Sequence, residues 1–287
     1  MNTGKLRNTI EGHSDGINSV AITADNNTIV SGSSDKTIKV WELSTGKLLN
    51  IIEGYSTLAI TSDISKIVSG SSDKTIKVWE LSTGKLLNSL EGHSHYVSSI
   101  SVTSDNTKIV SGSYKTIKVW DMNTGRLLNT LEGHSDSVKS VAITSDNTKI
   151  VSRSWDKTIK VWDLNTGELL NTLESDSSSV AITTDNNKIV SGSSDKTIKV
   201  WNLNTGKLLN TLEGHSASVS SVAITPDNNK NFLAIHYKIP IKFLVVGYPW
   251  TEILYPHIIG VTNIFCNVDV SLLNRDTLDM HPTHGVT

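Results

Sequence analysis

Histidine, serine and aspartate recur at matched positions along this chain, and together they are the side chains of a hydrolytic triad. Two sets are complete: His13 with Ser31 and Asp35, and His134 with Ser152 and Asp156. A catalytic triad is a single constellation whose nucleophile lies beside an oxyanion hole. A set that repeats along the chain is better explained as scaffolding, so we expect no enzymatic activity and no catalytic residues.

Two other patterns could in principle bind ligands. A Gly-Lys pair recurs, as at 46–47 and 84–85, but leucine follows the lysine where a phosphate-binding loop needs Ser or Thr. His281 and His284 could share zinc with nearby carboxylates, yet a mobile polar chain end explains them more simply. Cys266 lies in an apolar run, which favours a buried, inert thiol. We therefore expect no cofactor, no metal site and no small-molecule substrate.

Composition argues against several classes of partner. Among 287 residues, 26 Lys and Arg nearly balance 28 Asp and Glu, so bulk charge does not favour nucleic acid or an anionic membrane. The single cysteine excludes an intramolecular disulfide, and the N-terminal residues lack the apolar segment of a signal peptide. No window has the roughly 18 apolar residues of a membrane helix. These features predict a cytoplasmic protein without a membrane or nucleic-acid partner.

An internal repeat dominates the sequence and predicts its architecture. Tryptophan recurs at spacings of 38, 41, 42 and 39 residues, at Trp41, Trp79, Trp120, Trp162 and Trp201. The clearest copy, 133–174, contains four segments with alternating or β-branched residues, separated by turns rich in Asn, Asp, Gly and Ser. Each copy is therefore predicted to be a four-stranded antiparallel sheet. One such sheet cannot bury both faces alone, so the copies must pack side by side.

The copies resemble WD40 repeats over about residues 3–225. They share the period, the Gly-His pair at 12–13, 92–93, 133–134 and 214–215, and Trp-Asp pairs such as 120–121 and 162–163. The resemblance implies an all-β propeller that binds other proteins or peptides. It also implies that a His, a Ser, an Asp and the Trp of each blade form one hydrogen-bonded tetrad. Complete tetrads are His13, Ser31, Asp35 and Trp41 in blade one, and His134, Ser152, Asp156 and Trp162 in blade four.

Three blades depart from this pattern. Blade two has Tyr55 where the histidine belongs, blade three has lost one turn residue together with the aspartate, and blade five has lost the Gly-His pair. The remaining members are Ser69, Asp73 and Trp79 in blade two, His93, Ser111 and Trp120 in blade three, and Ser191, Asp195 and Trp201 in blade five. Because a partly satisfied buried network is weaker than a complete one, we expect these blades to be looser.

The ends of the chain are expected to complete the ring. We predict five recognisable blades and a sixth that is split between an N-terminal strand, 6–11, a strand at 220–225, and two tail strands, 232–239 and 241–248. The propeller then spans residues 1–248, with residues 231–248 completing the last blade, and 249–287 form a divergent tail. The alternative is a truncated or frame-disrupted fragment of a larger WD-repeat array without independent activity. An RNA-binding propeller and an enzyme are weaker alternatives.

A few residues interrupt the Ser-rich loops of the repeat. They are His95, Tyr96 and Tyr114 in blade three, and Arg153 and Trp155 in blade four. Tyr, Trp and Arg are enriched at the hot spots of protein interfaces, so these five residues are candidates for binding a partner. The competing explanation is drift, or packing around the shortened turn of blade three. The sequence leaves these two explanations open.

Overall fold

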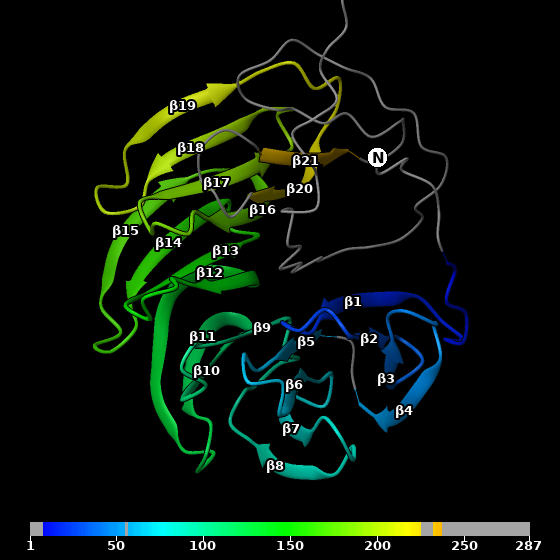
Figure 1. The fold of residues 1–287 in the computed structure, drawn as a ribbon. Coiled ribbons are helices and arrows are strands. Elements are labelled where there is room, and N and C mark those ends of the chain that lie inside the picture. Colours follow the sequence, from blue (N-terminus) through cyan, green and yellow to red (C-terminus); the bar gives the residue numbers. More distant parts are fainter. Residues whose placement is uncertain (1–7, 55–56, 225–231, 237–287) are drawn as a thin grey trace, which may run out of the picture.

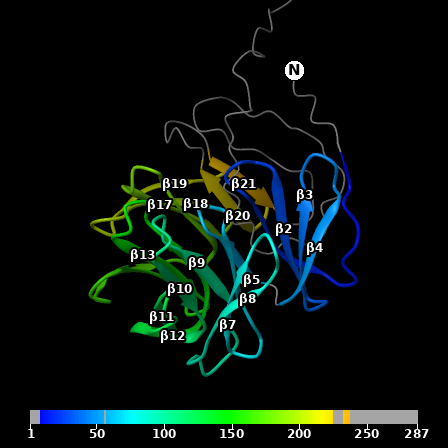
Figure 2. The ribbon, with the colours of Figure 1, turned by 60° about the horizontal axis from the view of Figure 1, so that its bottom comes forward.

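The computed structural model describes residues 8–54, 57–224 and 232–236. Every regular element in this part is a strand of an antiparallel sheet, which confirms the all-β, WD40-type fold. The sheets follow one another around an arc in chain order (Figure 1), and the view in Figure 2 shows neighbouring sheets standing beside one another. The described residues include no helix long and apolar enough to cross a membrane.

Three blades are separate four-stranded sheets whose strands pair in chain order, as short turns between antiparallel strands require. Blade one comprises β1 (Ile17–Ile22), β2 (Thr28–Ser33), β3 (Thr37–Glu42) and β4 (Leu48–Glu53). Blade two comprises β5 (Thr57–Ile60), β6 (Lys66–Gly70), β7 (Ile76–Glu80) and β8 (Leu86–Leu90). Blade five comprises β16 (Ser177–Ile182), β17 (Lys188–Ser193), β18 (Ile198–Asn202) and β19 (Leu208–Leu212).

Blades three and four form one seven-stranded sheet because they share a long strand, β12 (Leu127–Ile143). Its first part pairs with β11 (Tyr114–Asp121), and its last part pairs with β13 (Lys149–Ser154). The shortened turn lets β11 begin at Tyr114, which pairs with Ser137 of β12. The outer strands of this sheet are β9 (Ser99–Val102), β10 (Lys108–Gly112), β14 (Thr158–Asp163) and β15 (Leu169–Glu174). The two blades are thus joined directly through backbone hydrogen bonds.

A further sheet pairs β20 (Val219–Ile224) with β21 (Phe232–His236), and β20 also packs against β16 of blade five. A tail segment therefore supplies a strand next to β20. The other predicted tail strand, 241–248, and the segment 249–287 lie outside the described residues, as do Tyr55, Cys266, His281 and His284. Of the N-terminal strand predicted over 6–11, residues 8–11 are described and belong to no strand. Asn8 instead donates a hydrogen bond to the carbonyl oxygen of Thr45 in blade one, at 3.2 Å.

The apolar core lies between neighbouring blades. Alternation along each strand places β-branched side chains on the sheet faces, where the next sheet covers them. In blades two to five the tryptophan packs against the preceding blade: Trp162 of blade four joins a buried cluster with Val110 and Leu131 of blade three. Trp120 makes the equivalent contact with Val68 of blade two. The tetrad therefore holds in place a tryptophan ring that is also part of the interface between two blades.

The turn between the first two strands of a blade connects it to its neighbour. In blades three, four and five an asparagine in this turn has a positive φ, which Asn tolerates better than most residues. Its Oδ1 accepts a backbone N–H from the preceding blade; Asn147, for example, accepts from Ser104 at 3.0 Å. Blade two has Ile64 at the same position, with a φ of 61°. A β-branched residue is strained there and cannot accept this hydrogen bond.

Candidate protein-binding site

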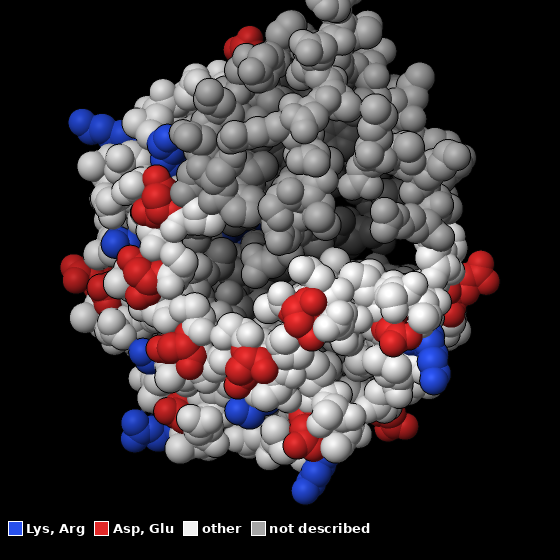
Figure 3. Space-filling model, in the orientation of Figure 1, with Lys and Arg blue, Asp and Glu red and all other residues white. Residues whose placement is uncertain are grey.

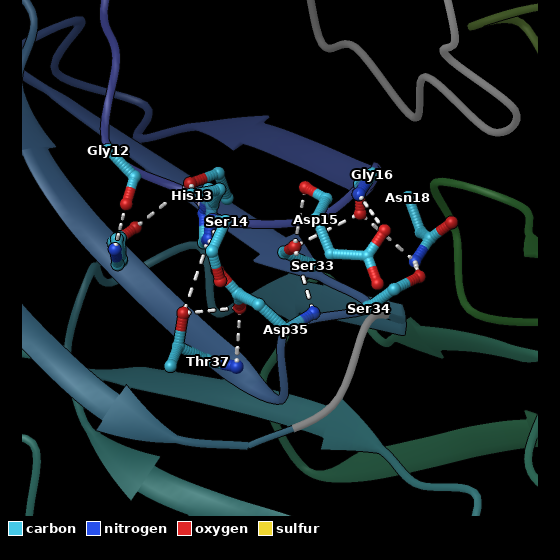
Figure 4. Close-up of polar contacts among 12 residues, drawn as sticks. Gly12, His13, Ser14, Asp15, Gly16, Asn18, Ser33, Ser34, Asp35 and Thr37 are labelled. Carbon is cyan, nitrogen blue, oxygen red and sulfur yellow. Dashed lines mark hydrogen bonds and ion pairs between the residues drawn. The ribbon is translucent and has the colours of Figure 1, made fainter.

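The tetrad of blade one shows how the repeated polar residues are arranged. The Nδ1–H of His13 donates to Asp35 at 2.8 Å, as Figure 4 shows, and its Nε2 accepts from the Ser31 hydroxyl at 2.8 Å. The indole N–H of Trp41 donates to the same hydroxyl oxygen at 2.8 Å. Every polar group of the set is thereby satisfied, and the loop before β1 is held against the turn between β2 and β3.

Blade four repeats this arrangement. The Nδ1–H of His134 donates to Asp156 at 2.7 Å, and Ser152 bonds both His134 and Trp162 at 2.8 Å. Burial disfavours the charged form of Asp156, but hydrogen bonds from Thr158, His134 and other donors outweigh it and lower the pKa of this carboxyl. The Ser152 hydroxyl is fully buried and already engaged on both sides. It is therefore a structural hydrogen-bonding group and not an exposed nucleophile.

Blade three retains only part of the network. His93 bonds Ser111 at 2.7 Å, and Trp120 donates to Ser111 at 2.8 Å. The buried Nδ1 of His93 has no hydrogen-bond partner in the described part of the chain, because the shortened turn carries no aspartate. Burial, and to a lesser degree the positive charge of Lys118, lowers the pKa of His93 to about 4. The ring is thus held neutral with one donor unsatisfied.

Blades two and five keep the Trp–Ser bond but not the rest. Trp79 donates to Ser69 at 2.9 Å, and Trp201 donates to Ser191 at 3.0 Å. No histidine donates a hydrogen bond to the aspartate in these blades, and the aspartate instead pairs with a lysine on the next strand. Lys77 lies 3.5 Å from Asp73, and Lys199 lies 2.8 Å from Asp195. The side chains of Asp73 and Asp195 are 39% and 45% exposed, against 5% for Asp156.

The residues that interrupt the repeat pattern gather at one place on blades three and four. The His95 and Tyr114 rings lie 4.8 Å apart between centroids. The Lys139 ammonium lies 4.3 Å from the centroid of Trp155 and 5.9 Å from that of Tyr96. Trp155 is 58% exposed, and both tyrosines are also exposed. We call His95, Tyr96, Tyr114, Lys115, Lys139 and Trp155 the aromatic–lysine patch; Lys115 lies 5.0 Å from the Tyr114 ring.

Lys139 was not singled out from the sequence, although its position differs from every other copy. The equivalent residues are Asn18, Ser98, Ser178 and Ser220. Lys139 lies in a bulge of β12, between Val138 and Ser140, where the register with β13 shifts. A bulge redirects the side chain of its extra residue. In blade one the matching pair, Asn18 and Ser34, forms a 2.7 Å hydrogen bond, which Figure 4 shows, whereas blade four has a lysine over a tryptophan.

Arg153 was grouped with these residues on sequence, but the structure places it differently. Its side chain is only 8% exposed, and Nη1 donates to the Ser177 carbonyl oxygen of blade five at 2.8 Å. Burial lowers the pKa of Arg153 to about 10. The other blades have glycine here, and a Cβ on Gly112 would lie 2.7 Å from a Val138 methyl. Blade five has the smaller Ser177 at that valine position, which leaves room for Arg153.

Comparison with known sequences decides the family. Six segments match the family described as "WD domain, G-beta repeat": residues 4–42, 46–80, 84–121, 125–163, 167–202 and 206–234. The matches cover well over half of the chain. The chain belongs to the WD40 family.

Two curated relatives are similar over a shorter stretch. Both are named "Ribosome biogenesis protein BOP1 homolog", one from Drosophila grimshawi and one from Drosophila ananassae, and each is 48% identical over 42 residues. The match covers 15% of this chain and 5% of each relative. Because 42 residues is the length of one WD40 repeat, the similarity is that of a single repeat.

The WD40 assignment clarifies the role of each set of residues. The tetrads recur blade after blade and stabilise the fold common to the family. The aromatic–lysine patch belongs to two blades only. WD40 proteins are generally scaffolds that bind other proteins, and the patch is where this chain departs from its own repeat pattern.

Proposed function

We propose that this chain is a non-catalytic WD40 scaffold that binds a protein partner through the aromatic–lysine patch of blades three and four. The observation that carries the proposal is the exposed Trp155, held beside Tyr96 by the ammonium of Lys139. Sister blades have small polar residues at the Trp155 position, as with Ser34, so the fold itself does not require an indole there. Large aromatic side chains exposed next to one another are typical anchors of protein interfaces.

The exposure of Trp155 supports partner binding over packing, the two explanations that the sequence leaves open. A residue recruited to fill a gap beside the shortened turn would be buried by its neighbours, but more than half of the Trp155 surface is accessible. Its described ring contact is with Lys139, a flexible side chain at the surface. Removing the indole therefore costs the folded chain little apolar burial, while it removes the largest available contact for a partner.

Trp155→Ser tests the proposal, because serine is what the sister blades carry. We expect a melting temperature within about 2 °C of wild type, as for surface substitutions, and loss of proteins that wild type captures from cell extract. Leu49→Ser is the matched control, since Leu49 is an equally exposed apolar residue on β4 of blade one. Partners retained by Trp155→Ser and lost with Leu49→Ser would contradict the proposal.

A second candidate is an incomplete WD40 array that needs further repeats to close. It is motivated by the divergence of the sequence from the repeat pattern after about residue 225. Truncation after Asn231, which removes β21, tests it. If β21 contributes to a closed ring, truncation exposes β20 and gives an aggregating product; a monodisperse and equally stable product supports an open array. The ribosome-biogenesis role of the two relatives is not proposed, because one repeat is too little to transfer it.

A further inference from the structure

We propose that the partner segment bound at the aromatic–lysine patch is acidic, with a carboxylate contacting the Lys139 ammonium beside Trp155. This inference rests on the proposed function and specifies the chemistry of the partner. It is carried by three observations: how the patch lysines are held, which other lysines of the repeat have carboxylate partners, and which additional cation lies on the neighbouring strand.

The two patch lysines are held by aromatic rings and not by carboxylates. Lys139 lies over Trp155 and near Tyr96, and Lys115 lies over Tyr114. Within the described part of the chain, neither ammonium has an ion-pair or hydrogen-bond partner. The ring contacts neutralise no charge, because the attraction is to the ring quadrupole. Both ammonium groups therefore remain able to donate to an incoming carboxylate, and the rings limit the conformations that each lysine must give up on binding.

Three lysines elsewhere in the repeat have carboxylate partners. Lys77 and Lys199 lie within ion-pair distance of Asp73 and Asp195 on their own blades. Lys157, the blade-four counterpart of Lys115, lies 3.7 Å from Asp176. Asp136 is the acid nearest in sequence to Lys139, and its carboxylate accepts the backbone N–H of Ser137. The patch thus presents two cations without a described carboxylate partner, whereas Lys157, at the equivalent turn position of blade four, already has one.

Arg153 adds positive charge on the strand that pairs with the Lys139 segment, although its guanidinium is directed to blade five. Ser140, next to Lys139 in sequence, pairs with Arg153 across β12 and β13. The buried guanidinium has no carboxylate within ion-pair distance in the described residues, and its Nε donates to no described acceptor. Asp176 offsets part of this charge. The remaining positive charge adds to the attraction for an anion at the neighbouring patch, because the protein interior screens charge less than water.

A peptide carboxylate fits this arrangement better than a nucleic-acid backbone. Phosphate-binding surfaces carry many cations in a stripe, whereas this patch has two exposed lysines and the whole chain has a net charge of −2. Figure 3 shows acidic and basic side chains dispersed over the face it views, without a basic track. A short acidic segment needs only one or two of the available cations.

Selection from a random library of displayed 12-residue peptides tests the inference. Peptides enriched on the folded wild-type chain are counter-selected against Lys139→Asn/Trp155→Ser, which installs the Asn and Ser found at these two positions in blade one. The strongest peptide is then synthesised, and its binding to each single variant is measured by fluorescence anisotropy. Lys157→Asn is the control, because that lysine of the same blade already has a carboxylate partner. Oligothymidylate of the same length is the nucleic-acid probe.

We expect enrichment of Asp and Glu, about tenfold weaker binding with Lys139→Asn, as for loss of a charge-assisted hydrogen bond, and little change with Lys157→Asn. Peptides that require Trp155 but show no acidic bias, with binding unaffected by Lys139→Asn, would overturn the acidic partner and leave the proposed function intact. A selection without any Trp155-dependent peptide would count against both. Lys139-dependent binding of oligothymidylate tighter than that of any peptide would overturn the inference in favour of nucleic acid.

Discussion

Blades three and four are neighbours joined by one strand, and the turn between the second and third strands is one residue shorter in blade three. Blade four closes its hydrogen-bond chain with Asp156, which accepts the Nδ1–H of His134. Blade three lacks that residue, so the Nδ1 of His93 is buried without a described partner, and β11 starts at Tyr114 instead. The comparison shows what one deletion does: blade three loses the Asp–His hydrogen bond, while both blades keep an exposed aromatic residue in this turn, Tyr114 and Trp155.

Blades two and five keep the aspartate of the tetrad but lack the histidine, so they show how the aspartate is arranged without its donor. Asp73 and Asp195 become more exposed and pair with lysines at the blade surface. Exposed ion pairs contribute little to stability because solvent screens them. The histidine is therefore what keeps this carboxylate buried and the loop before the first strand in place.

The largest effect on the free energy of unfolding is expected from substitution of the blade-four tryptophan. Trp162→Ala should lower the free energy of unfolding by about 3–5 kcal/mol, because it empties a buried site between blades three and four. Trp162→Phe should cost less, since it keeps most of the ring and loses mainly the bond to Ser152. Urea titration measures both. Equal losses for the two variants would mean that ring volume is unimportant at this interface.

The pH dependence of stability should distinguish the two histidines. Below its usual pKa of 6.5 an unfolded histidine gains a proton, whereas folded His93 stays neutral down to a pH of about 4. Its contribution to stability is therefore present above pH 6.5 and is lost as the pH falls to about 4, in total by roughly 3 kcal/mol.

His93→Gln should make the free energy of unfolding less dependent on pH between 6.5 and about 4. Burial also lowers the pKa of His134, but its bond to Asp156 offsets part of that effect. NMR titration of the two imidazoles should therefore show a lower pKa for His93. A pKa for His93 at or above that of His134 would contradict the missing-partner account.

The next largest difference in the free energy of unfolding is expected between the variants that remove each imidazole. His134→Ala should cost about 1–3 kcal/mol, because it leaves Asp156 and Ser152 buried without their partner. His93→Ala should cost less. It deprives only the Ser111 hydroxyl of a partner, and it removes a donor that is already unsatisfied. Unfolding of both variants in urea measures this difference. Equal losses would show that the aspartate adds nothing to the network.

The packing at the junction of blades four and five can be tested by installing the residues found at the junction of blades three and four. Arg153→Gly and Ser177→Val should each cost about 1–3 kcal/mol, the first by opening a cavity and the second by overpacking. The double variant recreates the Gly112–Val138 contact of the preceding junction and should recover most of the loss. A thermal double-mutant cycle measures the coupling. Additive losses would show that the two positions do not compensate for each other.

The smallest expected change is a gain in stability from a substitution at the junction of blades one and two. Ile64→Asn should stabilise the chain by about 0.5–1 kcal/mol, because Asn tolerates the positive φ and can accept a backbone N–H as Asn147 does. Ile64→Gly relieves the strain without supplying the acceptor, so the difference between the two variants isolates the hydrogen bond. A loss of stability with Ile64→Asn would show that the apolar contacts of Ile64 outweigh its strain.

Much of this fold could be predicted from the repeat, because period-2 alternation and turn residues are local signals. The family and the all-β architecture are confirmed. Residues 8–11 were expected in a strand, but strand formation depends on a partner strand, which local pattern does not reveal. The burial of Arg153 depends on Ser177, 24 positions away, and becomes visible only when neighbouring blades are superposed. Lys139 was missed because a lone lysine in a polar loop is usually solvated.

The most direct test is to revert the departures that build the patch while leaving the tetrads intact. A variant carrying His95→Asp, Tyr96→Ser, Lys139→Asn and Trp155→Ser has the residues of sister blades at all four positions. The account predicts a free energy of unfolding within about 1 kcal/mol of wild type and loss of the captured partner. A variant that unfolds much more easily, yet still captures the partner when folded, would show that these residues serve packing and would contradict the account.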